Sequence, residues 1–279
     1  MRMAMAGRGR STARWLAAAG LASVALSALL AGCATPQQQQ DAAAAAEMMT
    51  PSDEPENRRR ARIRLELASG YYQEGKTEVA LDELKQVIAI DPTLGDAYNL
   101  RGLIYMRLGD NRQAEDSFRR AVAINPRDAN AHHNYGWLQC QLGRYPESFR
   151  SFEQAMAHPL YPDKPKSLMA LGLCQARAGQ RAEAEHSLSR SYELDAGNPI
   201  TGYNLARLLY QRGDYARAQF YIRRLNNSEL ANAESLWLGI KVENRMNDTE
   251  ALGQLGDQLR KRYPQSRERQ ALDRKAFDE

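Results

Sequence analysis

The chain has 279 residues, with 38 Lys and Arg, 34 Asp and Glu, and only three cysteines. Its first 32 residues contain four arginines and no acid, so the remainder carries 34 charges of each sign. A formally neutral remainder argues against nucleic-acid binding, which needs a basic face.

Residues 1–32 are predicted to be a secretory signal peptide. Their four arginines all precede the uncharged run "WLAAAGLASVALSALLAG" at 15–32. A basic start, an apolar centre and small residues at the end are typical of such peptides. A transmembrane helix is the alternative, because 18 residues approach the minimum length that spans a bilayer. The run is rich in Ala, Gly and Ser, which makes it weakly apolar for a permanent span.

The sequence Leu30-Ala31-Gly32-Cys33 resembles the lipobox of bacterial lipoproteins. That resemblance implies cleavage before Cys33, with acyl chains on its thiol and on the new amine. Several acyl chains anchor a protein stably, whereas a single chain binds only marginally. Residue 34 is alanine rather than aspartate, which in such lipoproteins favours the outer membrane, facing the periplasm. The alternative is a cysteine placed there by chance.

Residues 33–60 are predicted to form the lipidated cysteine and a flexible tether. The stretch 34–57, "ATPQQQQDAAAAAEMMTPSDEPEN", has three prolines and no periodic apolar face. Such composition is typical of disordered segments. A flexible chain of this length spans roughly 25–30 Å on average, so a folded domain could search for a partner near the membrane.

A repeat begins after this segment and covers residues 61–264. Small residues recur with spacings of 34, 34, 36, 34 and 33 at Ala68, Gly102, Gly136, Gly172, Ala206 and Gly239. This period resembles the tetratricopeptide repeat. It predicts an all-α, right-handed α-solenoid of six helix-turn-helix repeats, with residues 265–279 as a C-terminal tail or capping helix. A generic helical bundle would not keep this register over six units.

The residue types of the repeat have physical reasons. Small residues let the two helices of a repeat approach closely, while large ones such as Tyr105 and Phe118 fill the space between neighbours. Glycines in "EGKT", "LGDN", "LGRY", "AGQR" and "RGDY" suit the tight turn between the helices. No repeat buries its apolar face alone, so the repeats must stack into one core.

No catalytic, metal-ligating or cofactor-binding pattern is apparent in the sequence. The four histidines are scattered, and the neighbours His132 and His133 point about 100° apart on a helix, so they cannot chelate together. The repeats also leave little room for a catalytic domain. The sequence therefore predicts a protein-binding scaffold that is not an enzyme and needs no cofactor.

The first helix of each repeat is expected to line a partner-binding groove. Counting the usual exposed positions along the repeats gives Leu65, Ser69, Tyr72, Asn99, Leu103, Met106, His133, Trp137, Met169, Leu173, Tyr203, Arg207, Tyr210, Leu236 and Ile240. The Lys and Asn clamp by which chaperone-binding repeats hold a C-terminal carboxylate is absent. This mainly apolar and aromatic set suits an amphipathic helix or an extended apolar segment. Some of these side chains could instead belong to the core.

Three further stretches point to one family. They are "HNYGWLQCQLGRYPESFRSFEQAM" at 133–156, "HPLYPDKPKSLMALGLC" at 158–174 and "KRYPQS" at 261–266. Together with the lipobox they resemble the type IV pilus biogenesis and stability lipoproteins of the PilW/PilF group. The resemblance implies an outer-membrane pilotin that helps the secretin, the pore through which the pilus leaves, to localise and multimerise. It implies a secretin partner and a lipid anchor, and we expect a monomeric solenoid.

Cys140 and Cys174 should lie late in the first helices of repeats 3 and 4, which are neighbours in the stack. An oxidising compartment permits a disulfide between them, and the bond would brace the longer connection between these repeats. Two small buried thiols are the alternative.

A different periplasmic scaffold is the alternative function. Such a protein would serve outer-membrane β-barrel assembly or a cell-wall enzyme complex.

Overall fold

A computed structural model describes residues 54–278. Within this range the chain forms thirteen α-helices and no strand. The first helices of the repeats, here called A helices, are α3 (Glu56–Gln73), α5 (Gly95–Leu108), α7 (Ala129–Gln141), α9 (Lys164–Arg177), α11 (Pro199–Arg212) and α13 (Ala233–Met246). The second or B helices are α4 (Thr77–Ile90), α6 (Asn111–Ile124), α8 (Tyr145–Met156), α10 (Arg181–Leu194), α12 (Tyr215–Asn226) and α14 (Thr249–Arg262). The predicted all-α repeat fold is confirmed.

The turns between A and B helices use residues with positive φ. Five of them contain glycines with φ between 73° and 86°, at Gly75, Gly109, Gly143, Gly179 and Gly213. In the sixth repeat, Asn247 takes the same left-handed conformation with φ 58°. Asparagine tolerates this region better than most residues with a side chain, so the last repeat turns without glycine.

The small residues expected between paired helices lie where the backbones approach. A Cβ added at Gly102 would lie 2.6 Å from the ring of Phe118, and one at Gly172 would lie 2.7 Å from Leu188. In both cases the neighbour belongs to the B helix of the same repeat. The spacing of small residues in the sequence therefore reports a packing requirement of each helix pair.

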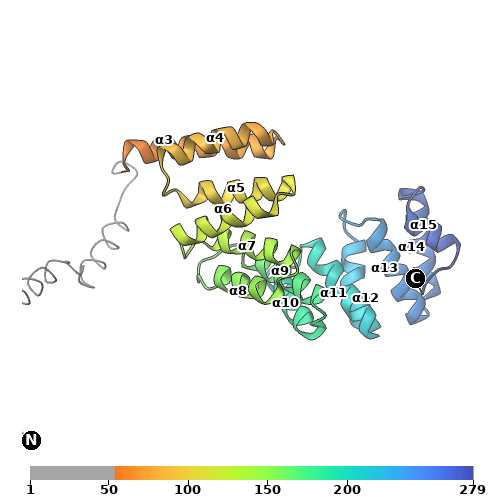
Figure 1. The fold of residues 1–279 in the computed structure, drawn as a ribbon. Helices are drawn as coiled ribbons and strands as arrows, with labels where there is room; N and C mark the ends of the chain where they lie inside the picture. Colours follow the sequence, from red (N-terminus) through yellow and green to blue (C-terminus); the bar gives the residue numbers. More distant parts are fainter. Residues whose placement is uncertain (1–53, 279) are drawn as a thin grey trace, which may run out of the picture. The chain divides into compact units, whose positions relative to one another are not determined.

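The repeats stack in chain order (Figure 1). Among the described residues, each A helix packs on its own B helix and on the next A helix, and each of the first five B helices packs on the next A helix. No helix contacts one beyond the adjacent repeat. Buried residues accordingly form a series of clusters along the stack, and stability comes from neighbouring contacts alone.

The folded region begins earlier than the sequence suggested. Helix α3 starts at Glu56, inside the segment 33–60 that we expected to be a tether. Glu56 lies in the first helical turn and pairs with Arg59 at 2.6 Å, while Arg58 reaches Asp91 at 3.7 Å. An acidic residue stabilises a helix N-terminus, and the Arg58–Asp91 pair connects the added turn to the rest of the fold.

The predicted signal peptide and Cys33 lie outside the described residues. Among the residues that are described, no helix is both long and apolar enough to cross a membrane.

The C-terminal segment covers the last repeat. A short helix, α15 (Arg267–Asp273), begins at the cap residue Ser266, and its Leu272 is buried against α13 and α14. After it, the ring of Phe277 stacks on Trp237 of α13 with centroids 5.8 Å apart. The capping helix expected within 265–279 is therefore present.

Candidate partner-binding groove

Most residues expected to line a groove are half-buried on the A helices. They are Leu65, Ser69, Tyr72, Asn99, Leu103, Met106, Trp137, Met169, Leu173, Tyr203 and Tyr210, while Arg207 is exposed. Many of them also pack against the core clusters, so they form the border between core and surface. Their role in binding stays a prediction.

His133 does not belong to an open groove. It is buried, and its Nδ1 lies 2.8 Å from the hydroxyl of Ser167 on α9, which in turn donates to the Tyr161 hydroxyl at 3.3 Å. Burial, aided by the charge of Lys166, lowers the pKa of His133 from 6.5 to about 4. The expectation for His133 was wrong because the first turn of α9 covers its side of α7.

Leu236 and Ile240 are also core residues rather than groove residues. Both are fully buried with Leu259 and Leu272. Position in the repeat suggested an exposed face here, but α15 and the residues after it close over α13. The A-helix face of repeat 6 is therefore partly occupied by the chain's own C-terminal segment.

Two predicted groove residues in the first repeats make contacts between repeats. The guanidinium of Arg107 lies 3.8 Å from the centroid of the Tyr72 ring and also donates to the Tyr72 carbonyl at 2.8 Å. Asn99 accepts a hydrogen bond of 3.0 Å from Asn134. These contacts link neighbouring A helices and leave less of this region open to a partner.

The predicted disulfide between Cys140 and Cys174 is present and joins α7 to α9, with their Cα atoms 5.9 Å apart. Trp137 packs at the edge of the cluster that contains both cysteines. The guanidinium of Arg177 lies 5.2 Å from the centroid of the Trp137 ring. The middle of the A-helix face thus combines a covalent brace, a half-buried indole and a cation.

Two adjoining pockets follow on this face. One, of about 570 Å³, lies between α9 and α11 and contains Arg177, Arg181 and Arg207. The other, of about 520 Å³, lies between α11 and α13 and is lined by Tyr203, Tyr210, Trp237, Lys241 and others. Arg207 and Gln211 line both, so the two pockets adjoin each other at these side chains. Sequence reasoning missed Arg177 and Arg181 because they lie at the helix ends, outside the usual binding positions.

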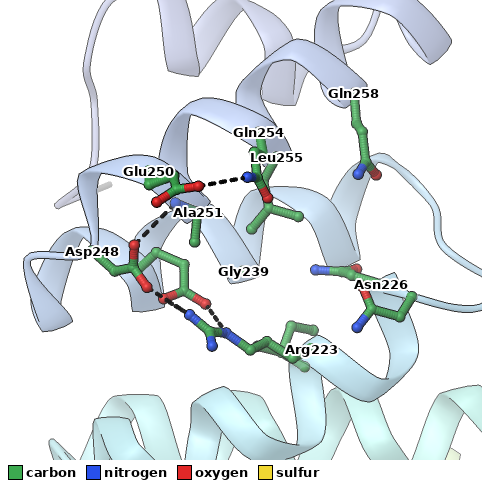
Figure 2. A pocket seen from close by; sticks show the side chains of 12 residues that line it. Arg223, Asn226, Gly239, Asp248, Glu250, Ala251, Gln254, Leu255 and Gln258 are labelled. Carbon is green, nitrogen blue, oxygen red and sulfur yellow. Dashed lines mark hydrogen bonds and ion pairs between the residues drawn. The ribbon is translucent and has the colours of Figure 1, made fainter.

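A third pocket, of about 320 Å³, lies among α12, α13 and α14 (Figure 2). Arg223 crosses it and binds Glu243 at 2.7 Å and Asp248 at 2.8 Å, and Asp248 also accepts from the Ala251 amide. Glu243 is fully buried, and a buried carboxylate requires such a partner. The charges of this pocket are therefore satisfied from within, which is typical of structural ion pairs.

The described residues contain no group of three or more His, Cys, Asp or Glu that could hold a metal ion. The Ser167 hydroxyl and the His133 ring lie in hydrogen-bonding distance, as in a nucleophile and its base. Both residues are buried, however, so a substrate carbonyl cannot approach the hydroxyl.

Models of the tetratricopeptide repeat match residues 69–109, 93–160, 141–199 and 175–236, which overlap into one continuous stretch. Repeat scaffolds of this kind are generally not enzymes. The type IV pilus assembly protein PilF of Pseudomonas aeruginosa is 29% identical to this chain over 206 residues, which cover 74% of this chain and 82% of PilF.

Two solved structures are similar over nearly their whole length. The crystal structure of PilW, described as a widely conserved type IV pilus biogenesis factor, is 31% identical with a TM-score of 0.70 and covers 76% of this chain and 97% of PilW. The structure of Pseudomonas aeruginosa PilF is 29% identical with a TM-score of 0.71 and covers 78% of this chain and 99% of PilF.

Proposed function

Because the chain belongs to the PilF/PilW family of tetratricopeptide repeat proteins, which act in type IV pilus biogenesis, we propose that it is an outer-membrane pilotin that binds secretin subunits. In this proposal the lipid on Cys33 holds the solenoid at the periplasmic face of the membrane. Tethering raises the local concentration of captured subunits and so favours their assembly into a ring there.

The observation that carries the proposal is the A-helix face around Trp137. It presents half-buried apolar and aromatic side chains next to two adjoining pockets, in a family whose members serve pilus biogenesis. Partly exposed aromatic side chains beside a pocket commonly contribute most of the free energy of binding to a protein partner. An extended or helical segment of a secretin subunit would lie along this face.

The first experiment deletes the gene and follows secretin in membrane fractions. We expect secretin monomers to accumulate at the expense of multimers, because ring assembly loses its membrane-bound chaperone. Complementation with the unaltered gene should restore the multimers. Normal multimers in the deletion strain would contradict the proposal and favour a different periplasmic scaffold role.

The second experiment tests the anchor. Cys33→Ser should abolish incorporation of labelled palmitate and release a folded protein from the outer membrane, since no acyl chain can be attached. Equal palmitate labelling of the variant and the unaltered protein would contradict the lipid anchor.

The third experiment tests the groove. Trp137→Ala should reduce secretin binding in a pull-down by about 2 kcal/mol or more. Phe220→Ala is the matched control, because Phe220 is an aromatic residue 60% exposed on the B helix α12. If Trp137→Ala instead lowered the melting temperature strongly, corresponding to a loss of about 3–5 kcal/mol of unfolding free energy, the indole would be a core residue. Unchanged melting with unchanged binding would place the partner elsewhere on the surface.

A further inference from the structure

The pocket between α9 and α11 concentrates positive charge without any acid of its own. Arg177 ends α9, Arg181 begins α10 and Arg207 lies on α11, and all three line the same space of about 570 Å³. None of the other residues that line it is acidic. Within the described part of the chain, none of these three arginines has a carboxylate within 4.0 Å.

Several other arginines of the same repeats are neutralised by carboxylates. Arg212 and Arg217 both pair with Glu185, at 2.5 and 2.9 Å, and Arg223 pairs with Glu243. The chain therefore supplies carboxylates to Arg212, Arg217 and Arg223 but not to the three arginines of this pocket. Three guanidinium groups that line one pocket without a carboxylate repel one another, and an anionic ligand would relieve this repulsion.

Two of the three guanidinium groups lie over aromatic rings instead. Arg177 lies over Trp137, and the guanidinium of Arg207 lies 6.0 Å from the centroid of the Tyr203 ring. A contact of this kind restrains the guanidinium group. Arg177 also donates one hydrogen bond to Cys140 Sγ at 3.8 Å, which leaves its other N–H donors available. Leu173 and Leu208 add an apolar lining. The site thus offers oriented cation donors beside apolar surface.

We propose that this pocket receives an acidic segment of a partner protein, with two or three Asp or Glu side chains that alternate with apolar residues. A carboxylate matches the fork of an arginine in a bidentate pair, and three arginines call for more than one carboxylate. The inference rests on the proposed function, since it names the chemistry of the segment that the groove would bind. It adds a charged anchor to a groove that the sequence suggested was apolar and aromatic.

The shape and lining of this pocket favour an acidic peptide, rather than an anionic membrane surface, as its ligand. The pocket is walled by α9 and α11 and lined partly by leucines, which suits alternating acidic and apolar side chains. On its far side, Arg207 borders the next pocket, whose lining includes Glu234 and Glu268. These carboxylates would repel an acidic segment there, so the acidic part of the ligand is confined to the region of Arg177 and Arg181.

The test measures fluorescence anisotropy of a labelled decapeptide of alternating Glu and Leu, amidated at its C-terminus, with the purified full-length chain. Arg177→Gln/Arg181→Gln/Arg207→Gln should weaken binding by roughly tenfold or more, because three exposed charge pairs are lost. Added salt should weaken binding to the unaltered chain, since exposed pairs are screened. The control Arg112→Gln/Arg127→Gln/Arg150→Gln removes the same charge from exposed positions outside the pocket and should bind normally.

Two further peptides identify the source of the carboxylate. A Gln and Leu peptide with an amidated end should bind weakly, and the same peptide with a free carboxylate should gain little. Strong binding of the free-carboxylate form would overturn the proposal in favour of C-terminal capture. Equal binding of the Glu and Gln peptides, or equal losses in both triple variants, would also overturn it.

A charge reversal protects the test against a folding defect. Arg177→Glu/Arg181→Glu/Arg207→Glu should no longer bind the Glu peptide and should bind a matched peptide of alternating Lys and Leu. An unfolded variant would not show this selective exchange of ligand. No secretin is present in these assays. If the Glu peptide does not bind but secretin is still pulled down, only the inference of an acidic ligand is rejected. If the Glu peptide binds but secretin is not pulled down, the secretin partner is rejected and the acidic ligand is retained.

Discussion

Acidification should destabilise the fold through one buried histidine. His133 lies between α7 and α9 with its Nδ1 2.8 Å from the Ser167 hydroxyl. Burial, with a smaller contribution from Lys166, lowers its pKa from 6.5 to about 4 in the folded chain. The folded state therefore keeps this ring neutral under conditions where an unfolded chain would protonate it.

The sign and size of the effect follow from the two pKa values. Between pH 6.5 and about 4, the unfolded chain binds a proton at His133 that the folded chain does not, so stability rises with pH across this window. A difference of this size corresponds to about 3 kcal/mol of unfolding free energy, lost as pH falls from the upper to the lower value. At higher pH the ring is neutral in both states and contributes no slope.

Urea unfolding followed by circular dichroism at about pH 7, about pH 5.5 and about pH 4.5 measures this slope. His133→Asn keeps a polar atom near the position of Nδ1 but cannot titrate. It should be less stable near neutral pH, because ring contacts with Phe152 are lost, and should show a much flatter dependence on pH. His186→Asn changes an exposed ring and should keep the dependence of the unaltered protein.

An unchanged slope in His133→Asn would refute the reasoning and transfer the effect to carboxylates. Glu115 is such a group. Burial alone would raise its pKa, but the hydrogen bond from Arg144 and the charges of Arg119 and Arg144 lower it below 4.5. Its contribution is present above 4.5 and is lost only as pH falls through the lower folded value, so its window begins at the acidic end of the His133 window and extends below it.

Two other predictions concern covalent and steric constraints. Cys140→Ala/Cys174→Ala should lower the unfolding free energy by about 4 kcal/mol, because the bond closes a loop with a sequence separation of 34. Reductant should lower the urea midpoint of the unaltered protein but not that of this variant. Equal shifts of the midpoint in both proteins would contradict the disulfide. Gly102→Ala should destabilise by about 1–3 kcal/mol through collision with Phe118, despite the helix preference of alanine. Gly70→Ala, with nothing within 4 Å of the added Cβ, should instead raise the unfolding free energy by up to about 1 kcal/mol. Urea unfolding of both variants measures the difference.

The repeat architecture could be predicted because its signals are local. Each A-to-B turn needs a residue that tolerates positive φ, and each helix crossing needs a small residue. Each of these requirements falls on a single position of the repeat. Gly109 and Gly102 show the two kinds, and both recur with the period. Cys140 and Cys174 followed from the same register, since equivalent positions on adjacent A helices are close in space.

The composition of the groove could not be predicted in the same way. Exposure of an A-helix residue depends on what the next element covers, and His133 and Leu236 show this at the connection before α9 and at the C-terminal cap. The charge of the pocket depends on which arginines find carboxylates on other helices. Arg212 finds Glu185, 27 residues away, while Arg177 and Arg181 find none among the described residues. Spacing within a repeat carries no information about either outcome.

The disulfide divides the stack into segments of different cooperativity. Since each repeat contacts only its neighbours, the helices can open from either end in small steps rather than all together. The bond between α7 and α9 stops this fraying in the middle of the chain. Arg177 lies three residues after the bonded Cys174, so the α9 wall of the arginine pocket is fixed to repeat 3. The facing wall, α11, has no covalent link to α9 and is held by packing and by polar contacts with α10, such as the Arg212–Glu185 ion pair. We therefore expect the α11 side of the pocket to adjust more readily than the α9 side when a chain binds.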